Sequence, residues 1–215
     1  MEFHWLRRGQ NDRLVLFVLG WAADYRVVEH IGLPGCDVLA VYDYGGGLDD
    51  GLAEKIAGYG DVRLLAWSFG VWVAERLLAG VELTRAVALN GTPVPVDALY
   101  GIEPRRMAVT LRGLKAGGME AFDRRAYGEH FDRLRPVLSP RPQERNIAEL
   151  EYLVEASAAG HAASLRWDKA IVGSEDLIFP PENMVRYWGS RAEVLPLPHY
   201  PFADGGLIEK EIGCR

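Results

Sequence analysis

A serine stands where an apolar stretch of the chain meets a helix-like stretch. Leu64-Leu65-Ala66-Trp67 leads into Ser68, and Gly70 follows two positions later. The pattern small-x-Ser-x-Gly is typical of a nucleophile on a strained strand-to-helix turn, where the residues two before and two after the serine lie close together and must be small. Ala66 replaces the more usual glycine, and a serine helix cap would also suit such a junction. The strand before Ser68 and the helix after it favour the nucleophile.

A histidine and an aspartate follow predicted strands nearer the carboxyl terminus. His199 comes after the last predicted strand, at a position from which a general base could reach Ser68. Asp176 follows the preceding predicted strand and could hold the imidazole in one tautomer. Glu175 is the rival acid. The order serine, acid, histidine is that of the α/β-hydrolases, so the residues predict nucleophilic hydrolysis by Ser68, Asp176 and His199.

Two backbone N–H groups are candidate donors for an oxyanion hole. One donor usually belongs to the residue after the nucleophile, and the other comes from the loop after an earlier strand. Phe69 directly follows the serine, and Trp21 follows Gly20 at the end of a strongly apolar run. A plain turn with a core tryptophan would show the same pattern at Trp21.

Short apolar runs that alternate with helix-like stretches predict the elements that position these residues. A run such as residues 14–19, apolar throughout, is typical of a strand buried on both faces. Alternation of strand and helix indicates a parallel sheet with crossover helices. The predicted strands are residues 14–19, 38–42, 62–66, 86–89, 169–173 and 192–197, with 2–7 as a candidate edge strand; the predicted helices include 50–58, 69–78, one opening at Pro180-Pro181, and 205–212 capped by Asp204.

The alternation stops after Asn90, and no convincing strand follows until residue 169. The intervening segment is helical and polar in character. An insertion there would lie above the carboxyl ends of the strands, where ligands bind in open α/β sheets. We therefore predict one α/β-hydrolase domain over residues 1–215, with a mostly parallel sheet, flanking helices and a helical lid insertion at about 92–165.

Composition excludes several other classes of protein. The 215 residues are 49% hydrophobic and 25% charged, with a net charge of −6, which argues against a nucleic-acid binder. The two cysteines, Cys36 and Cys214, are far apart and form no zinc-ligand spacing, so no metal is expected. The sequence shows no signal-peptide pattern and no apolar run long enough to span a bilayer. We interpret the protein as cytoplasmic, without membrane contact, and as a monomer by default.

Four motifs are spread along the chain. They are Gly20-Trp21-x-x-Asp24, Val41-Tyr42-Asp43-Tyr44, Ala66-Trp67-Ser68-Phe69-Gly70-Val71-Trp72 and His199-Tyr200-Pro201-Phe202. At these motifs the sequence resembles the BioG family of pimeloyl-[acyl-carrier protein] methyl ester esterases. The likeness spans nearly the whole chain and is weakest in the insertion. It implies hydrolysis of a carrier-bound methyl ester in biotin synthesis, with an acyl-carrier protein as partner and no cofactor.

Arginines are concentrated in the predicted insertion, although the chain as a whole is acidic. Arginine pairs well with phosphate and carboxylate groups, and a carrier protein offers both. We hypothesise that Arg124, Arg125 and Arg133 dock the carrier; a solvated face balanced by nearby acids is the alternative. The arginines of this segment include Arg105, Arg106, Arg112, Arg124, Arg125, Arg133, Arg135 and Arg141.

Three questions stay open at this point. The same three residues would serve a thioesterase or a general carboxylesterase, and a hydrolase-like fold can also act only as a binding protein. The length of the acyl group depends on pocket depth. Asp24 and Asp43 are prominent in the sequence, but the pattern assigns neither a role.

Overall fold

The computed structural model describes residues 1–48, 51–138, 140–160 and 165–213. Their strands form one sheet in the order β1-β3-β2-β4-β5-β6-β7. Every neighbouring pair is parallel except β1 and β3, which run antiparallel at one edge. The predicted mostly parallel α/β fold is confirmed. The strands are β1 (Glu2–Arg7), β2 (Arg13–Val18), β3 (Asp37–Tyr42), β4 (Asp61–Trp67), β5 (Arg85–Leu89), β6 (Lys169–Gly173) and β7 (Ala192–Leu195).

The central strands are buried on both faces, as their continuous apolar runs require. Leu14 to Val18 in β2 expose no surface to solvent. The last strand is shorter than predicted, because β7 ends at Leu195 rather than at Leu197. Pro196 follows directly, and proline has no N–H with which to extend a ladder of hydrogen bonds.

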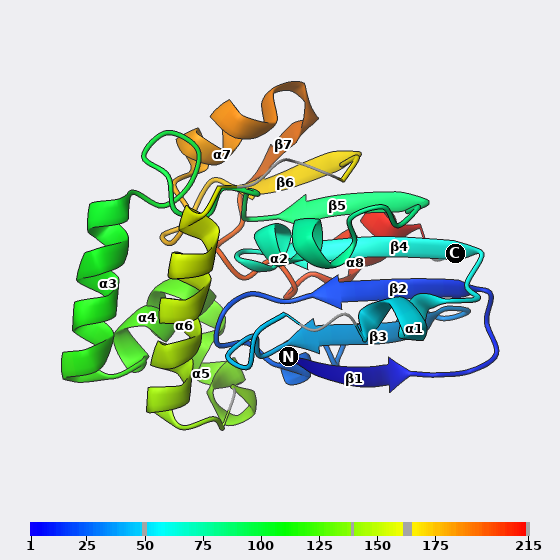
Figure 1. Ribbon diagram of the computed structural model, residues 1–215, viewed down its shortest axis with the longest axis horizontal. Helices are drawn as coiled ribbons and strands as arrows, with labels where there is room; N and C mark the ends of the chain where they lie inside the picture. Colours follow the sequence, from blue (N-terminus) through cyan, green and yellow to red (C-terminus); the bar gives the residue numbers. More distant parts are fainter. Residues whose placement is uncertain (49–50, 139, 161–164, 214–215) are drawn as a thin grey trace.

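Helices cover both faces of this sheet (Figure 1). Helices α1 (Leu52–Ile56) and α2 (Gly70–Leu77) lie in front of the strands, and α8 (Gly205–Ile212) lies behind them. Helix α7 (Pro181–Trp188) packs beside β6 and β7. The predicted cap on α8 is present, because the Asp204 carboxylate accepts the N–H of Leu207 at 3.2 Å.

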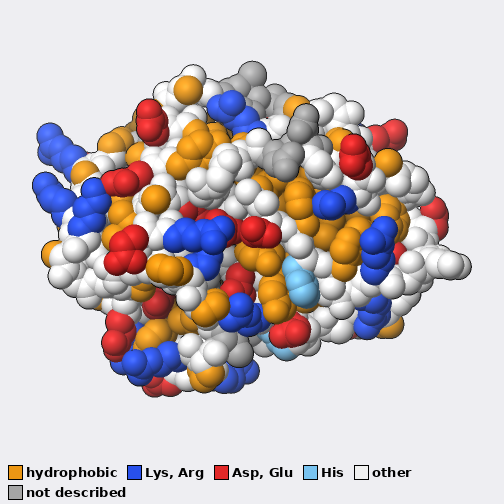
Figure 2. Space-filling view, turned by 60° about the horizontal axis from the view of Figure 1, so that its bottom comes forward, with side chains coloured by type: hydrophobic (Ala, Val, Ile, Leu, Met, Phe, Trp, Pro, Cys, Tyr) orange, Lys and Arg blue, Asp and Glu red, His pale blue; other side chains and the backbone are white. Residues whose placement is uncertain are grey.

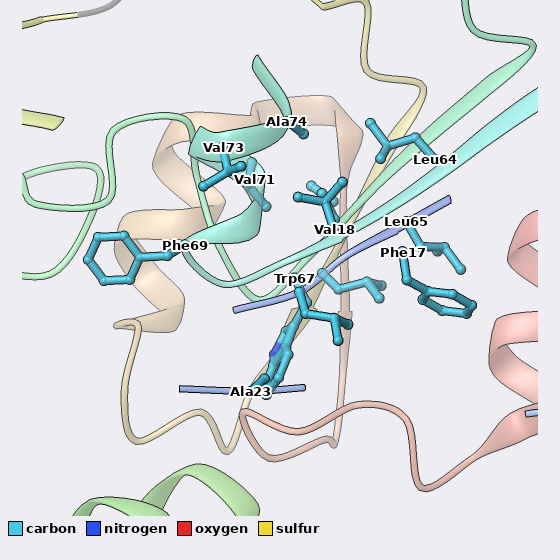
Figure 3. Close-up of a cluster of buried hydrophobic side chains, with 14 of the residues drawn as sticks. Phe17, Val18, Ala23, Leu64, Leu65, Trp67, Phe69, Val71, Val73 and Ala74 are labelled. Atoms are coloured by element: carbon cyan, nitrogen blue, oxygen red, sulfur yellow. The ribbon is translucent and has the colours of Figure 1, made fainter. Parts of the chain in front are cut away.

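Helix α2 packs closely on β2 and β4. Val71 and Ala74 of the helix lie against Val18 and Leu64 of the strands in the buried cluster of Figure 3. Gly70 opens this helix where it touches the backbone of β2. A Cβ atom at Gly70 would lie 2.2 Å from the carbonyl oxygen of Val18. The close packing of α2 on β2 therefore requires glycine at position 70, the second small position of the serine motif.

Among the described residues, four α-helices separate β5 from β6 and cover the ends of the strands at the left of Figure 1, where β2, β3, β4 and β5 finish. We call this group the insertion; residues 161–164 of the predicted segment lie outside the described residues. Its α-helices are α3 (Pro104–Gly117), α4 (Glu120–Tyr127), α5 (Phe131–Leu134) and α6 (Gln143–Ala158). Short 3-10 turns lie at Tyr25–Val27, Gly128–His130, Arg135–Val137 and Gly189–Arg191.

Cys36 is buried with a free thiol, and Cys214 lies outside the described residues. Within the described ranges, no helix combines the length and apolar character needed to cross a membrane.

Replacing Gly70 by alanine should lower the free energy of unfolding by about 1–3 kcal/mol, because the new methyl group collides with the β2 backbone. Gly113→Ala is the matched control, since nothing lies within 4 Å of a Cβ atom at this helical glycine. It should raise stability by about 1 kcal/mol. Denaturant unfolding measures both changes. Equal effects at the two positions would contradict the packing argument.

Candidate active site

Ser68 occupies a turn that few residues with a side chain adopt. Its φ angle is +59°, in the left-handed region, and it links β4 directly to α2. Neighbouring backbone closes around it, because a Cβ atom at Gly91 would lie 2.4 Å from the Ser68 carbonyl oxygen and one at Gly20 would lie 2.9 Å from the Ser68 Cβ. Such strain persists only when surrounding structure enforces it, and it is common at functional sites.

The structure brings together the three side chains predicted to form the triad. His199 Nε2 lies 3.0 Å from Ser68 Oγ, and His199 Nδ1 lies 2.7 Å from Asp176 Oδ2. The other oxygen of Asp176 accepts the N–H groups of Ile178 at 2.7 Å and Phe179 at 2.9 Å. These bonds fix the carboxylate in place and orient the imidazole. The three residues are 5%, 2% and 5% exposed, in the order Ser68, His199 and Asp176.

The rival acid, Glu175, does not take part in this arrangement. Glu175 is exposed, and its backbone N–H donates to the carbonyl of Leu197. Asp176 occupies the buried position one residue later, where its carboxylate faces the histidine.

Asn90, which sequence reasoning missed as a site residue, holds the histidine loop. Its side-chain amide donates to the carbonyls of Pro198 at 2.8 Å and His199 at 2.9 Å, and its oxygen accepts the Gly173 N–H at 2.6 Å. The indole of Trp67 donates to the same His199 carbonyl at 2.8 Å. The signal in the sequence was an asparagine at the point where the strand alternation stops. Asparagine also tolerates the positive φ of 46° found there.

The two predicted oxyanion donors belong to segments next to the serine. Phe69 follows it, and Trp21 lies in the loop after β2, beside Gly20. Among the described residues, no hydrogen-bond acceptor is assigned to the backbone N–H of Phe69 or Trp21. The Trp21 side chain is held separately, because its indole donates to the Asn146 carbonyl at 2.6 Å.

An apolar pocket opens beside the serine and the imidazole. Burial raises the pKa of the Tyr127 hydroxyl in its wall, so this group stays neutral near pH 7. Thr110, Arg106 and Arg125 add polar groups to the lining, and both arginines are exposed residues. The walls of the pocket comprise Trp21, Trp67, Ser68, Phe69, Ile102, Arg106, Met107, Thr110, Phe122, Arg125, Ala126, Tyr127, Leu150, Leu177, Ile178 and His199.

The arginines of the insertion have different environments. Arg125 lines the pocket, whereas Arg124 is ion-paired with Glu120 at 2.8 Å and lies over the Phe131 ring. Arg133 is exposed. Arg141, another arginine of the same segment, is turned inward, with a side chain only 10% exposed and paired with carboxylates. The sequence could not distinguish buried from surface arginines.

Asp24 has a local structural role. Its carboxylate accepts the N–H of Arg26 at 3.0 Å, which caps the turn Tyr25–Val27, and it pairs with the Arg26 guanidinium. Burial raises the pKa of Asp24, partly opposed by these contacts. No group of three or more His, Cys, Asp or Glu side chains within the described ranges could hold a metal ion.

The parallel sheet, the strained serine turn and the helical insertion define an α/β-hydrolase. The family model described as pimeloyl-ACP methyl esterase BioG matches residues 1–204, and the chain belongs to this family. The crystal structure of BioG from Haemophilus influenzae superposes with a TM-score of 0.85 at 34% identity, covering 94% of this chain and 95% of that one.

Three further proteins are similar to this chain. An uncharacterized protein of Haemophilus influenzae is 37% identical over 90% of this chain and 91% of its own length. A malonyl-[acyl-carrier protein] O-methyltransferase of Bacteroides fragilis is 33% identical over 81% of this chain, but the match covers only 36% of that protein. A carboxylesterase structure from Nitrososphaera gargenis shares the fold, with a TM-score of 0.69 at 14% identity, over 99% of this chain and 92% of that one.

Replacing Asn90 by alanine should cost about 2 kcal/mol of folding free energy and slow the reaction of Ser68 with a fluorophosphonate. The substitution removes the partners that Asn90 offers to the Pro198 carbonyl and the Gly173 N–H, and it loosens the histidine loop. Asn183→Ala is the control, since Asn183 is also buried and donates to the Gly101 carbonyl. It should cost similar stability without slowing the labelling. Equal labelling rates in both variants would show that Asn90 does not position the histidine.

Proposed function

We propose that this protein is a serine esterase that hydrolyses the methyl ester of pimeloyl-[acyl-carrier protein] in biotin synthesis. The observation that carries the proposal is the 3.0 Å approach of His199 Nε2 to Ser68 Oγ at the wall of an apolar pocket, in a chain of the BioG family. We further propose a cytoplasmic monomer, a single hydrolase domain with residues 92–165 as its lid insertion, and no requirement for a cofactor.

In the proposed reaction, the Ser68 oxygen attacks the ester carbonyl while His199 Nε2 accepts the hydroxyl proton. Asp176 stabilises the resulting imidazolium through its contact with Nδ1. The backbone N–H groups of Trp21 and Phe69 donate to the oxyanion of the tetrahedral intermediate. The intermediate collapses as His199 returns the proton to the departing methoxide, which leaves as methanol. Water, deprotonated by His199, then attacks the acyl-enzyme, and a second collapse releases the carboxylic acid and restores Ser68.

Two observations support a carrier-bound acyl chain as substrate. The walls of the pocket are mainly apolar, which suits a methylene chain that extends inward toward Ser68. The Bacteroides fragilis relative is named for methyl transfer to a malonyl group on a carrier protein, and it contains a segment similar to this chain. A methyl ester on a carrier-bound acyl group is the kind of product that such an enzyme makes.

The surface around the pocket bears on how a carrier would dock. Figure 2 shows Lys and Arg side chains interspersed with Asp and Glu over the left part of the face in view. Because the surface is mixed, we assign docking to particular arginines rather than to a uniformly basic patch. Arg125 and Arg106 are the first candidates, because they line the pocket. The proposed docking residues also include Arg133 and Arg124, which is ion-paired with Glu120.

Ser68→Ala should lower hydrolysis of the carrier-bound methyl ester by at least about 10³-fold, because it removes the nucleophile. Methanol release measures this loss, and fluorophosphonate labelling should disappear with it. The gene should restore biotin-independent growth to a strain without this esterase step, and the variant gene should fail to do so. Cleavage of the thioester instead of the methyl ester would indicate a thioesterase. Undiminished turnover by the variant would rule out the serine mechanism.

Arg124→Glu combined with Arg133→Glu should raise KM for the carrier-bound ester at least fivefold, because the reversed charges repel an acidic partner. Hydrolysis of a small soluble ester should change less than twofold. Arg166→Glu is the control: Arg166 is exposed and precedes β6, at the opposite end of that strand from the site. Equal losses on both substrates would reject the docking role.

A further inference from the structure

We infer that Glu149, on helix α6 of the insertion, is a positioning residue that holds the oxyanion turn. The inference rests on the proposed function, since it concerns the turn that carries the Trp21 N–H. It also assigns a role to Asp43, a prominent motif residue that the reaction itself does not use.

The Glu149 carboxylate lies among backbone N–H groups of two loops. Its Oε2 accepts the N–H of Ala22 at 3.3 Å, and its Oε1 accepts the N–H of Tyr44 at 2.8 Å. Glu149 is fully buried. Ala22 directly follows Trp21 and has a φ of +60°, a conformation unfavourable for alanine. A strained turn of this kind needs an external contact to keep it, and Glu149 supplies one.

A buried charge cluster fixes the Glu149 carboxylate. Arg141 places its guanidinium 3.1 Å from Glu149 Oε2 and 2.8 Å from Asp43 Oδ1. Arg145 lies 2.6 Å from the other oxygen of Asp43. A buried charge is costly unless it is paired, so each member of the cluster depends on the others. Asp43 follows β3 and thus anchors the insertion to the sheet.

The same helix holds the other side of Trp21. Asn146 lies one turn before Glu149 on α6, and its carbonyl accepts the Trp21 indole N–H at 2.6 Å. Residues three apart share one face of a helix. One face of α6 therefore contacts both the Trp21 indole and the backbone N–H of Ala22, the next residue. These two contacts together fix the direction of the Trp21 backbone N–H.

This geometry has a specific consequence for catalysis. A donor that is misaligned by a fraction of an ångström still admits the planar substrate but binds the tetrahedral oxyanion less well. The insertion therefore acts as a fixed wall of the active site on its α6 side. Loss of Glu149 should affect kcat and transition-state binding, and should leave KM nearly unchanged.

The test is Glu149→Gln, which preserves size but presents an NH₂ group to one of the two N–H donors. With p-nitrophenyl hexanoate, kcat should fall about tenfold or more while KM stays within twofold. The inhibition constant of hexylboronic acid, which forms a tetrahedral adduct with serine, should rise by a factor similar to the fall in kcat. Glu155→Gln, at an exposed position on the same helix, should match the wild type.

Three outcomes would overturn the inference. They are wild-type kcat in Glu149→Gln, a loss confined to KM, or a loss fully explained by a smaller active fraction in fluorophosphonate titration. Failure of the proposed function is distinct, because wild-type protein would then be inactive on esters and unlabelled at Ser68.

If Glu149→Gln does not fold, Glu149→Asp is measured in the same way. It retains the charge opposite Arg141 but is too short to reach both N–H groups. If neither variant folds, amide hydrogen exchange is measured in the unmodified protein. The Ala22 N–H should exchange slowly, as a donor to a buried carboxylate does, and rapid exchange would contradict the inference.

Discussion

In the turn after β4, the Ser68 backbone is held in a left-handed conformation by neighbours that leave no space for side chains. Gly70 lies against the β2 backbone, Gly91 against the Ser68 carbonyl, and Gly20 against the Ser68 Cβ. Three neighbouring strands of the sheet, β2, β4 and β5, thus converge on one residue. The hydroxyl has a fixed position because the backbone around it cannot move, and the remaining groups of the site are arranged about that position.

The histidine is held mainly through its backbone. Trp67 and Asn90 both donate to the His199 carbonyl, and Asn90 also accepts from Gly173 at the end of β6. The Asp176 carboxylate in turn accepts two backbone N–H groups. Each of these bonds is buried, and breaking one would leave an unpaired polar group in the core. The loops that carry Asp176 and His199 are therefore tied to strand ends, which restricts the imidazole to the vicinity of Ser68.

Some side chains of the insertion line the pocket, and others contact the loop after β2 beside the serine. Its outer arginines include Arg106 and Arg125 at the pocket, whereas Arg141 lies inside between Asp43 and Glu149. These two groups have opposite physical requirements. A surface arginine is hydrated and available to an acidic partner, but a buried one is stable only with its carboxylates in place. The same residue type, common along one segment, therefore lies at the surface in one place and in a buried ion-pair cluster in another.

The sequence by itself determined the parallel α/β class, most strand positions, and the order of Ser68, Asp176 and His199, because local periodicity and turn chemistry carry those signals. Tertiary structure decided the rest. It selected Asp176 over Glu175 by burial, turned Arg141 inward, and brought Asn90 and Glu149 to backbone groups far along the chain. Such contacts leave no periodic pattern in one sequence, since the partner of a side-chain amide or carboxylate is a backbone group that every residue possesses. Only the folded chain shows which backbone groups lie within hydrogen-bond distance.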